Sequence, residues 1–148
     1  MFTKTSLFNS MVIATFLLVG CCIDPEQRLN TAFSESDWIE MKMLIGDELA
    51  EGIKFTYRTE EEKVKLDEGV GTIETADSTC LYEMGRLVFI KGEKGIAEMM
   101  FRSDGSCAYA WFESGMEGKA FKLSDSLAIL IQDRFNLVST VKGPKAES

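Results

Sequence analysis

The stretch RSDGSCAYAWF, residues 102–112, decides the fold class that we expect for this chain. Asp104-Gly105 is a strong signal for a tight hairpin turn. The segments on either side of it, 96–101 and 106–112, are rich in the apolar residues typical of strands. Because a parallel crossover needs a dozen or more residues, so short a connection makes the two strands antiparallel.

Similar segments lie on both sides of this hairpin and are separated by short turns. The six main strand candidates are 72–75, 79–83, 86–90, 96–101, 106–112 and 118–123. Upstream, residues 53–58 alternate strictly between apolar and polar, which also predicts a half-buried strand. The acidic run 60–62 then predicts a solvated turn, and Val64 and Leu66 continue into a further strand candidate.

Helical spacing flanks these strands at both ends. The segment 34–51 has N-cap candidates, a glycine after its last residue and an apolar stripe formed by Trp38, Met41, Leu44, Ile45 and Leu49. The segment 125–135 follows Ser124 as N-cap, ends at Asn136 and has its own stripe at Leu127, Leu130, Ile131 and Phe135. Residues 137–141 are then a last strand or a packed tail.

The expected architecture is α+β. It consists of an antiparallel meander sheet of about six strands, covered by an N-terminal and a C-terminal helix. The geometry that we favour is a half-closed sheet wrapped around the first helix. No internal repeat or low-complexity segment interrupts this pattern.

Composition excludes several classes of function. The chain has 148 residues, 45% hydrophobic and 27% charged, as is typical of one globular domain. It contains no histidine, which excludes Ser-His-Asp triads and histidine-ligated zinc sites. A net charge of −8 disfavours nucleic acid as a partner. Nucleotide-binding, nucleophile-elbow and EF-hand motifs are missing, so we expect no enzyme, no cofactor and no metal, and infer no small-molecule substrate.

The first residues carry an export signal. Lys4 is the only charged residue among residues 1–20, and MVIATFLLV, residues 11–19, is an apolar run too short to span a membrane. Leu18-Val19-Gly20-Cys21 resembles the lipobox of bacterial lipoproteins. The resemblance implies that residues 1–20 are a cleaved signal peptide and that Cys21 carries acyl chains such as palmitate. It also implies, because Cys22 rather than Asp follows, an outer-membrane location facing the periplasm.

The resemblance divides the chain into four parts. Residues 1–20 are the signal peptide, 21–34 a lipid-anchored tether, 35–142 a single periplasmic domain and 143–148 a frayed tail. Within the tether, Asp24-Pro25 offers the start of a short helix, and a plain spacer is the alternative. Several acyl chains hold a protein at a membrane stably, because each buried methylene contributes about 0.8 kcal/mol.

Export also bears on Cys80 and Cys107. An oxidising compartment preserves disulfides, and Cys21 and Cys22 lie at the membrane, so we expect a Cys80–Cys107 bond. Two free buried thiols are the alternative. The expected bond closes a loop that would contribute roughly 3–4 kcal/mol on the chain-entropy account.

Tyr109 and Trp111 share one face of a strand that is apolar on both faces. Such a strand is normally central and buried on both sides. An exposed aromatic patch is the alternative, and in that case Tyr109 and Trp111 contact a partner.

Three functions remain open. The one we expect is a membrane-anchored, non-catalytic binding or assembly-accessory module of the cell envelope, with another envelope protein as partner. The second is an acidic periplasmic inhibitor or immunity protein against a cationic hydrolase or toxin, because opposite charge speeds encounter. The third is a carboxylate-based enzyme acting on cell-wall glycans.

Overall fold

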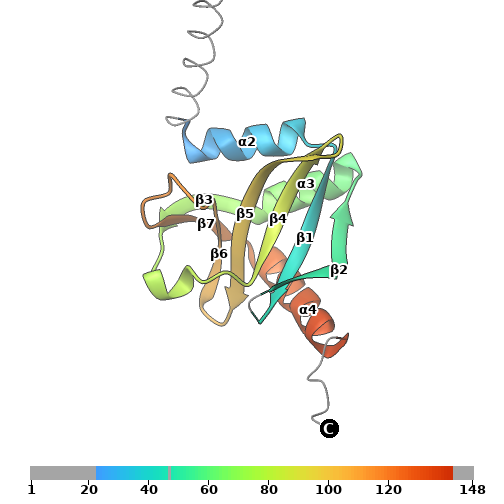
Figure 1. Cartoon of the computed structure of the whole chain (residues 1–148). Helices are drawn as coiled ribbons and strands as arrows, with labels where there is room; N and C mark the ends of the chain where they lie inside the picture. Colours follow the sequence, from blue (N-terminus) through green and yellow to red (C-terminus); the bar gives the residue numbers. More distant parts are fainter. Residues whose placement is uncertain (1–22, 47, 142–148) are drawn as a thin grey trace, which may run out of the picture.

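A single antiparallel sheet organises the molecule (Figure 1). The computed structural model describes residues 23–46 and 48–141. Seven strands lie in the order β2-β1-β4-β5-β6-β7-β3, and every neighbouring pair is antiparallel. They are β1 (Trp38–Ile45), β2 (Glu48–Tyr57), β3 (Val70–Thr75), β4 (Gly85–Lys91), β5 (Lys94–Asp104), β6 (Cys107–Trp111) and β7 (Lys119–Leu123). The predicted α+β class is therefore confirmed.

Helices cover one face of this sheet. They are α2 (Pro25–Glu35), α3 (Glu60–Gly69) and α4 (Asp125–Val141), and a short 3-10 turn, η1, spans Ser78–Cys80. Figure 1 shows α2 across the ends of β4 and β5, and α4 running along the back of the sheet. The ring of Phe33 in α2 packs edge-on against Phe89 in β4, with 5.0 Å between centroids. The hydroxyl of Ser103 in β5 donates to the Ala128 carbonyl in α4 at 2.7 Å.

The helix expected over 34–51 does not form: residues 34 and 35 end α2, and the rest of the segment folds into β1 and the first part of β2. Ile39, Met41 and Met43 are completely buried on one face of β1, a spacing of two rather than the helical three or four. Gly46 lies at the turn with φ of 66°, which glycine adopts at little steric cost. The core therefore lies between the sheet and the other helices, and no sheet wraps around a helix at 34–51.

Residues 25–34, which the sequence places in the tether, belong to helix α2 (Pro25–Glu35). Pro25 is its first residue and Asp24 its N-cap, as the short-helix alternative requires. Leu29, Ala32 and Phe33 are buried in the main core. The plain-spacer interpretation is wrong for these residues, because they supply apolar surface to the sheet.

The acidic run 60–62 begins helix α3 rather than forming a turn. The Thr59 hydroxyl accepts from the Glu62 N–H at 3.1 Å, and the Glu62 carboxylate accepts from the Thr59 N–H at 3.0 Å. This reciprocal capping box stabilises the first turn of a helix. Leu66 is therefore buried from a helix, and the strand expected at Val64 and Leu66 is wrong.

Two further boundaries differ from expectation. Residues 79–83 do not form a strand; they continue from η1 into a segment without regular structure. Helix α4 does not end at Asn136 but continues to Val141, because completely buried Val138 extends its apolar stripe one heptad beyond Ile131. Residues 137–141 are thus helical rather than a strand or tail.

Candidate functional site

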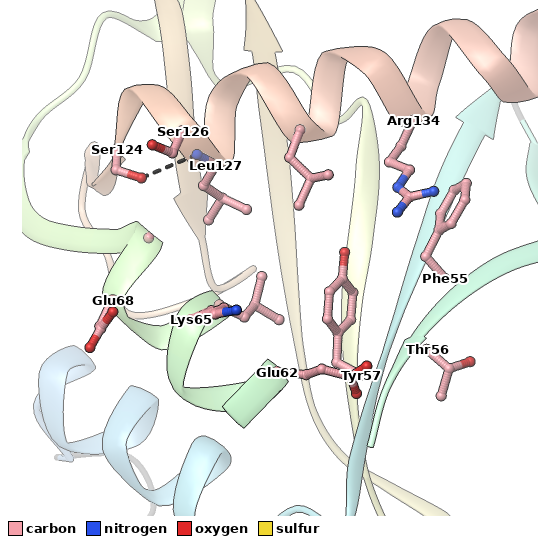
Figure 2. A pocket seen from close by; sticks show the side chains of 13 residues that line it. Phe55, Thr56, Tyr57, Glu62, Lys65, Glu68, Ser124, Ser126, Leu127 and Arg134 are labelled. Carbon is pink, nitrogen blue, oxygen red and sulfur yellow. Dashed lines mark hydrogen bonds between the residues drawn. The ribbon is translucent and has the colours of Figure 1, made fainter. Parts of the chain in front are cut away.

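A cavity of about 630 Å³ opens between α3, α4 and the edge strand β2 (Figure 2). Its volume lies within the roughly 300–1,000 Å³ typical of small-ligand sites. Local sequence signals position each wall. The capping box fixes the start of α3, and Ser124 caps α4 by accepting from the Leu127 N–H at 3.2 Å. The third wall is the last part of β2, held by its pairing with β1.

Most of the cavity wall is apolar. The residues that supply it are Phe55 and Tyr57 from β2, Leu66 from α3, and Leu127 and Leu130 from α4. The two helices approach closely at Gly69, where an added Cβ would lie 2.7 Å from a Leu127 methyl. Glycine at this position lets α3 and α4 meet and closes one end of the cavity.

Arg134 brings a positive charge into this apolar setting. Figure 2 shows its side chain descending from α4 toward Phe55 and the hydroxyl end of Tyr57. The guanidinium carbon lies 4.5 Å from the centroid of the Phe55 ring, a cation–π arrangement. Its Nε is buried and has no hydrogen-bond partner. Leaving such a donor unsatisfied typically costs about 1–3 kcal/mol.

The Tyr57 hydroxyl is a polar group close to Arg134 in the cavity. Burial raises the pKa of its phenol, the positive charge of Arg134 opposes this, and the negative charge of Glu62 adds to it. The hydroxyl donates only a weak hydrogen bond, to the Met41 sulfur at 3.9 Å. The Tyr57 hydroxyl is therefore neutral around pH 7 and lies close enough to Arg134 to respond to its charge.

The remaining charged residues of the wall have other roles. Glu62 accepts from the backbone N–H groups of Thr59 and Arg58, and these bonds lower the pKa of its carboxyl. Lys65 pairs with Glu61 at 3.0 Å on the surface of α3. Glu68 points away from Arg134 in Figure 2. Arg134 is consequently the charged group best placed to meet a ligand.

This arrangement suits binding. An apolar body finds hydrocarbon walls, and one polar end finds the guanidinium and the phenol hydroxyl. Within residues 23–46 and 48–141, no three His, Cys, Asp or Glu side chains gather closely enough to hold a metal ion.

The predicted Cys80–Cys107 disulfide is present, with 5.2 Å between the Cα atoms. Cys80 lies in η1 rather than in the expected strand, and Cys107 begins β6. The bond fastens η1 to the sheet face opposite α4. An Arg102 guanidinium N–H that donates to the Tyr82 carbonyl at 3.4 Å helps to hold the same segment.

Tyr109 and Trp111 are buried, with 9% and 8% of their surface exposed. Strand β6 lies between β5 and β7, as expected of a strand that is apolar on both faces. The Tyr109 hydroxyl donates to the Glu74 carboxylate at 2.8 Å. The two rings therefore belong to the core, and the exposed-patch alternative is wrong.

The lipidation site predicted at Cys21, together with Cys22 and the signal peptide 1–20, lies outside the described residues. In the part of the chain that is described, no helix combines the length and apolar character needed to cross a membrane.

Sequence reasoning did not find this cavity. Two of its signals were nevertheless readable: the Thr59-x-x-Glu62 capping box and the aromatic pair Phe55 and Tyr57 on one face of a strand. The position of Arg134 opposite that pair depends on how α4 packs against the sheet, which no local pattern specifies.

No protein family, curated protein or solved structure matches this chain.

Proposed function

We propose that this chain is a lipid-anchored lipoprotein of the bacterial envelope with a non-catalytic binding module. The binding site is the cavity between α3, α4 and β2. The observation that carries the proposal is the buried, unpartnered Nε of Arg134 in a cavity whose wall is mostly apolar. A purely structural arginine is normally satisfied by hydrogen bonds, whereas ligand sites place a few polar groups among apolar walls.

The anchor rests on the Leu18–Cys21 lipobox. In this proposal Cys21 is lipidated, and Cys22 permits sorting to the outer membrane, facing the periplasm. Replacing Cys21 by Ser should abolish incorporation of labelled fatty acid and leave the chain unprocessed. Normal labelling of that variant would refute the anchor. The substitution Cys22→Asp should shift the protein toward the inner membrane.

The binding site is tested with a photoactivatable aliphatic probe applied to the membrane-bound, full-length protein. Covalent labelling should map, by mass spectrometry, to peptides of β2, α3 and α4. The substitution Leu130→Trp, which fills the cavity, should remove most of it. Ile129→Trp is the matched control, because the neighbouring Ile129 is 60% exposed and lies outside the cavity. Absence of cavity labelling, or equal labelling of both variants, would refute the binding site.

A further inference from the structure

We propose that the cavity binds an aliphatic carboxylate, with its hydrocarbon chain along the apolar wall and its carboxylate on the guanidinium of Arg134. This inference deepens the proposed function and rests on it. It starts from three properties of the described residues: an Arg134 guanidinium without a counterion, a Glu62 carboxylate held by backbone N–H groups, and a mostly apolar wall.

Arg134 is the described arginine whose Nε is buried without a hydrogen-bond partner; Arg58 also stacks on a ring without a guanidinium hydrogen bond, but it is exposed. The guanidinium groups of Arg28, Arg86 and Arg102 all donate to oxygen atoms of the protein. Arg134 instead stacks on Phe55 and has no ion pair or hydrogen bond to any described residue. Stacking fixes the plane of the guanidinium, and the N–H groups at its edge then have a set direction. A fixed, planar set of donors matches the geometry of a carboxylate.

The acidic side chains nearby do not neutralise this cation. The Glu62 carboxylate is held by the Arg58 and Thr59 N–H groups at 2.8 and 3.0 Å. Its negative charge still influences Tyr57, so it adds negative potential near the cavity floor. With the negative potential of Glu62 nearby, the single positive charge of the Arg134 guanidinium can compensate at most one negative charge on a ligand. A ligand with two charges, such as a phosphate monoester, would leave one of them uncompensated in an apolar site.

The walls select the rest of the ligand. The apolar lining residues come from all three walls: Leu127 and Leu130 from α4, Leu66 from α3, and the rings of Phe55 and Tyr57 from β2. These apolar side chains gain from covering a hydrocarbon chain and offer it no hydrogen bonds. The Tyr57 hydroxyl can donate to the second carboxylate oxygen, because its present bond to sulfur is weak.

The experiment compares three photoactivatable probes that differ only in the end group: octanoate, octanol and octylamine. Each is applied at neutral pH to the full-length protein in its membrane, and labelling of cavity peptides is quantified. The wild-type protein should be labelled by octanoate about tenfold more efficiently than by octanol, and least by octylamine. Equal labelling by octanoate and octanol would overturn the carboxylate inference while leaving the proposed binding site intact. No cavity labelling by any probe would overturn both.

Two substitutions assign the preference to Arg134. In Arg134→Gln, octanoate labelling should fall about tenfold, to the octanol level, while octanol labelling stays unchanged. Arg134→Lys keeps the charge without the planar donors and should retain part of the preference. The matched control is Arg58→Gln, because Arg58 also stacks on an aromatic ring, Trp38 at 4.7 Å, but is exposed and lies outside the cavity. A tenfold preference that survives in Arg134→Gln would overturn the assignment.

Discussion

In two regions of the molecule an arginine guanidinium stacks on a phenylalanine ring, but its N–H groups are used differently. Near the start of the chain, Arg28 of α2 lies 4.1 Å from the Phe112 ring and donates to the Ser114 carbonyl at 2.8 Å. Near the other end, Arg134 of α4 lies 4.5 Å from the Phe55 ring, with its Nε buried and unpartnered. The first arginine fastens a helix to the sheet. Arg134 makes the same kind of stacking contact in the wall of a cavity, and its buried Nε–H has no acceptor within the described protein.

The contrast shows that stacking on an aromatic ring does not by itself indicate the role of an arginine. The deciding feature is whether the guanidinium N–H groups have hydrogen-bond acceptors within the protein. At α2 a backbone carbonyl accepts from them, so the site is complete within the protein. At α4 the protein supplies no acceptor among the described residues. If the contrast holds, the two helices contribute similarly to the core, whereas the two arginines differ in what they contribute to stability and binding.

The largest expected effects test whether α2 belongs to the same core as α4. Leu29 and Leu127 are both 5% exposed, so Leu29→Ala and Leu127→Ala remove matched side chains from the two helices. Each substitution should lower the free energy of unfolding by about 2–5 kcal/mol, measured by urea denaturation. A change below about 0.5 kcal/mol for Leu29→Ala, within the range of surface substitutions, would instead make α2 peripheral.

The second prediction concerns the Cys80–Cys107 disulfide, which lies on the sheet face opposite α2 and α4. Replacing Cys80 and Cys107 together by Ala should lower the free energy of unfolding by roughly 2–4 kcal/mol. The physical reason is the freedom that the unfolded chain regains when the loop opens. The binding preference for octanoate should remain, because neither cysteine lines the cavity. Loss of that preference in a folded variant would show that the two faces are coupled.

A smaller effect distinguishes the two arginines directly. Arg28→Gln removes a charged hydrogen bond and should cost about 1–2 kcal/mol of stability. Arg134→Gln loses a stacking contact, which lowers stability, and removes an unsatisfied buried donor, which raises it. These effects oppose each other, so the free energy of unfolding should change by less than about 0.5 kcal/mol. Thermal unfolding of the two variants under identical conditions makes the comparison. Equal losses would remove the contrast between a fastening arginine and a binding one.

The smallest effect concerns the ionisation of Tyr57. Its pKa is raised in the folded protein, so its contribution to stability is complete below the unfolded pKa near 10 and is lost as pH rises through the folded value. Because the charge of Arg134 opposes this rise, Arg134→Gln should raise the pKa of Tyr57 further, whereas Arg28→Gln should not. Alkaline titration of tyrosinate absorbance, with Tyr57→Phe subtracted, measures the shift. An unchanged pKa of Tyr57 in Arg134→Gln would show that the charge of Arg134 does not act on the Tyr57 phenol.

The first helix expected from the sequence shows how one pattern supports two structures. Between residues 38 and 49, apolar side chains at 38, 41, 44, 45 and 49 match a helical stripe. Those at 39, 41 and 43 match a strand equally well, and these three are the ones that are buried. The choice between the two depended on pairing with β2 and β4, because partners distant in sequence supply the hydrogen bonds of a strand.

Sequence alone determined the features that depend on near neighbours along the chain. The Asp104-Gly105 hairpin, the antiparallel α+β class, the start of α4 after Ser124 and the candidate cysteine pair all follow from local chemistry or from simple elimination. The buried, central character of β6 followed from its apolar residues on both faces.

Only the tertiary structure decided the cavity. Arg134 lies more than 70 residues from Phe55 and Glu62 in sequence, and it meets them because β2 is the sheet edge beside which α3 and α4 pack. The helical register of α4 directs Arg134 toward Phe55, and the close approach at Gly69 sets how near α3 comes. These are consequences of long-range packing, in which many weak contacts act together, so no short stretch of sequence encodes them.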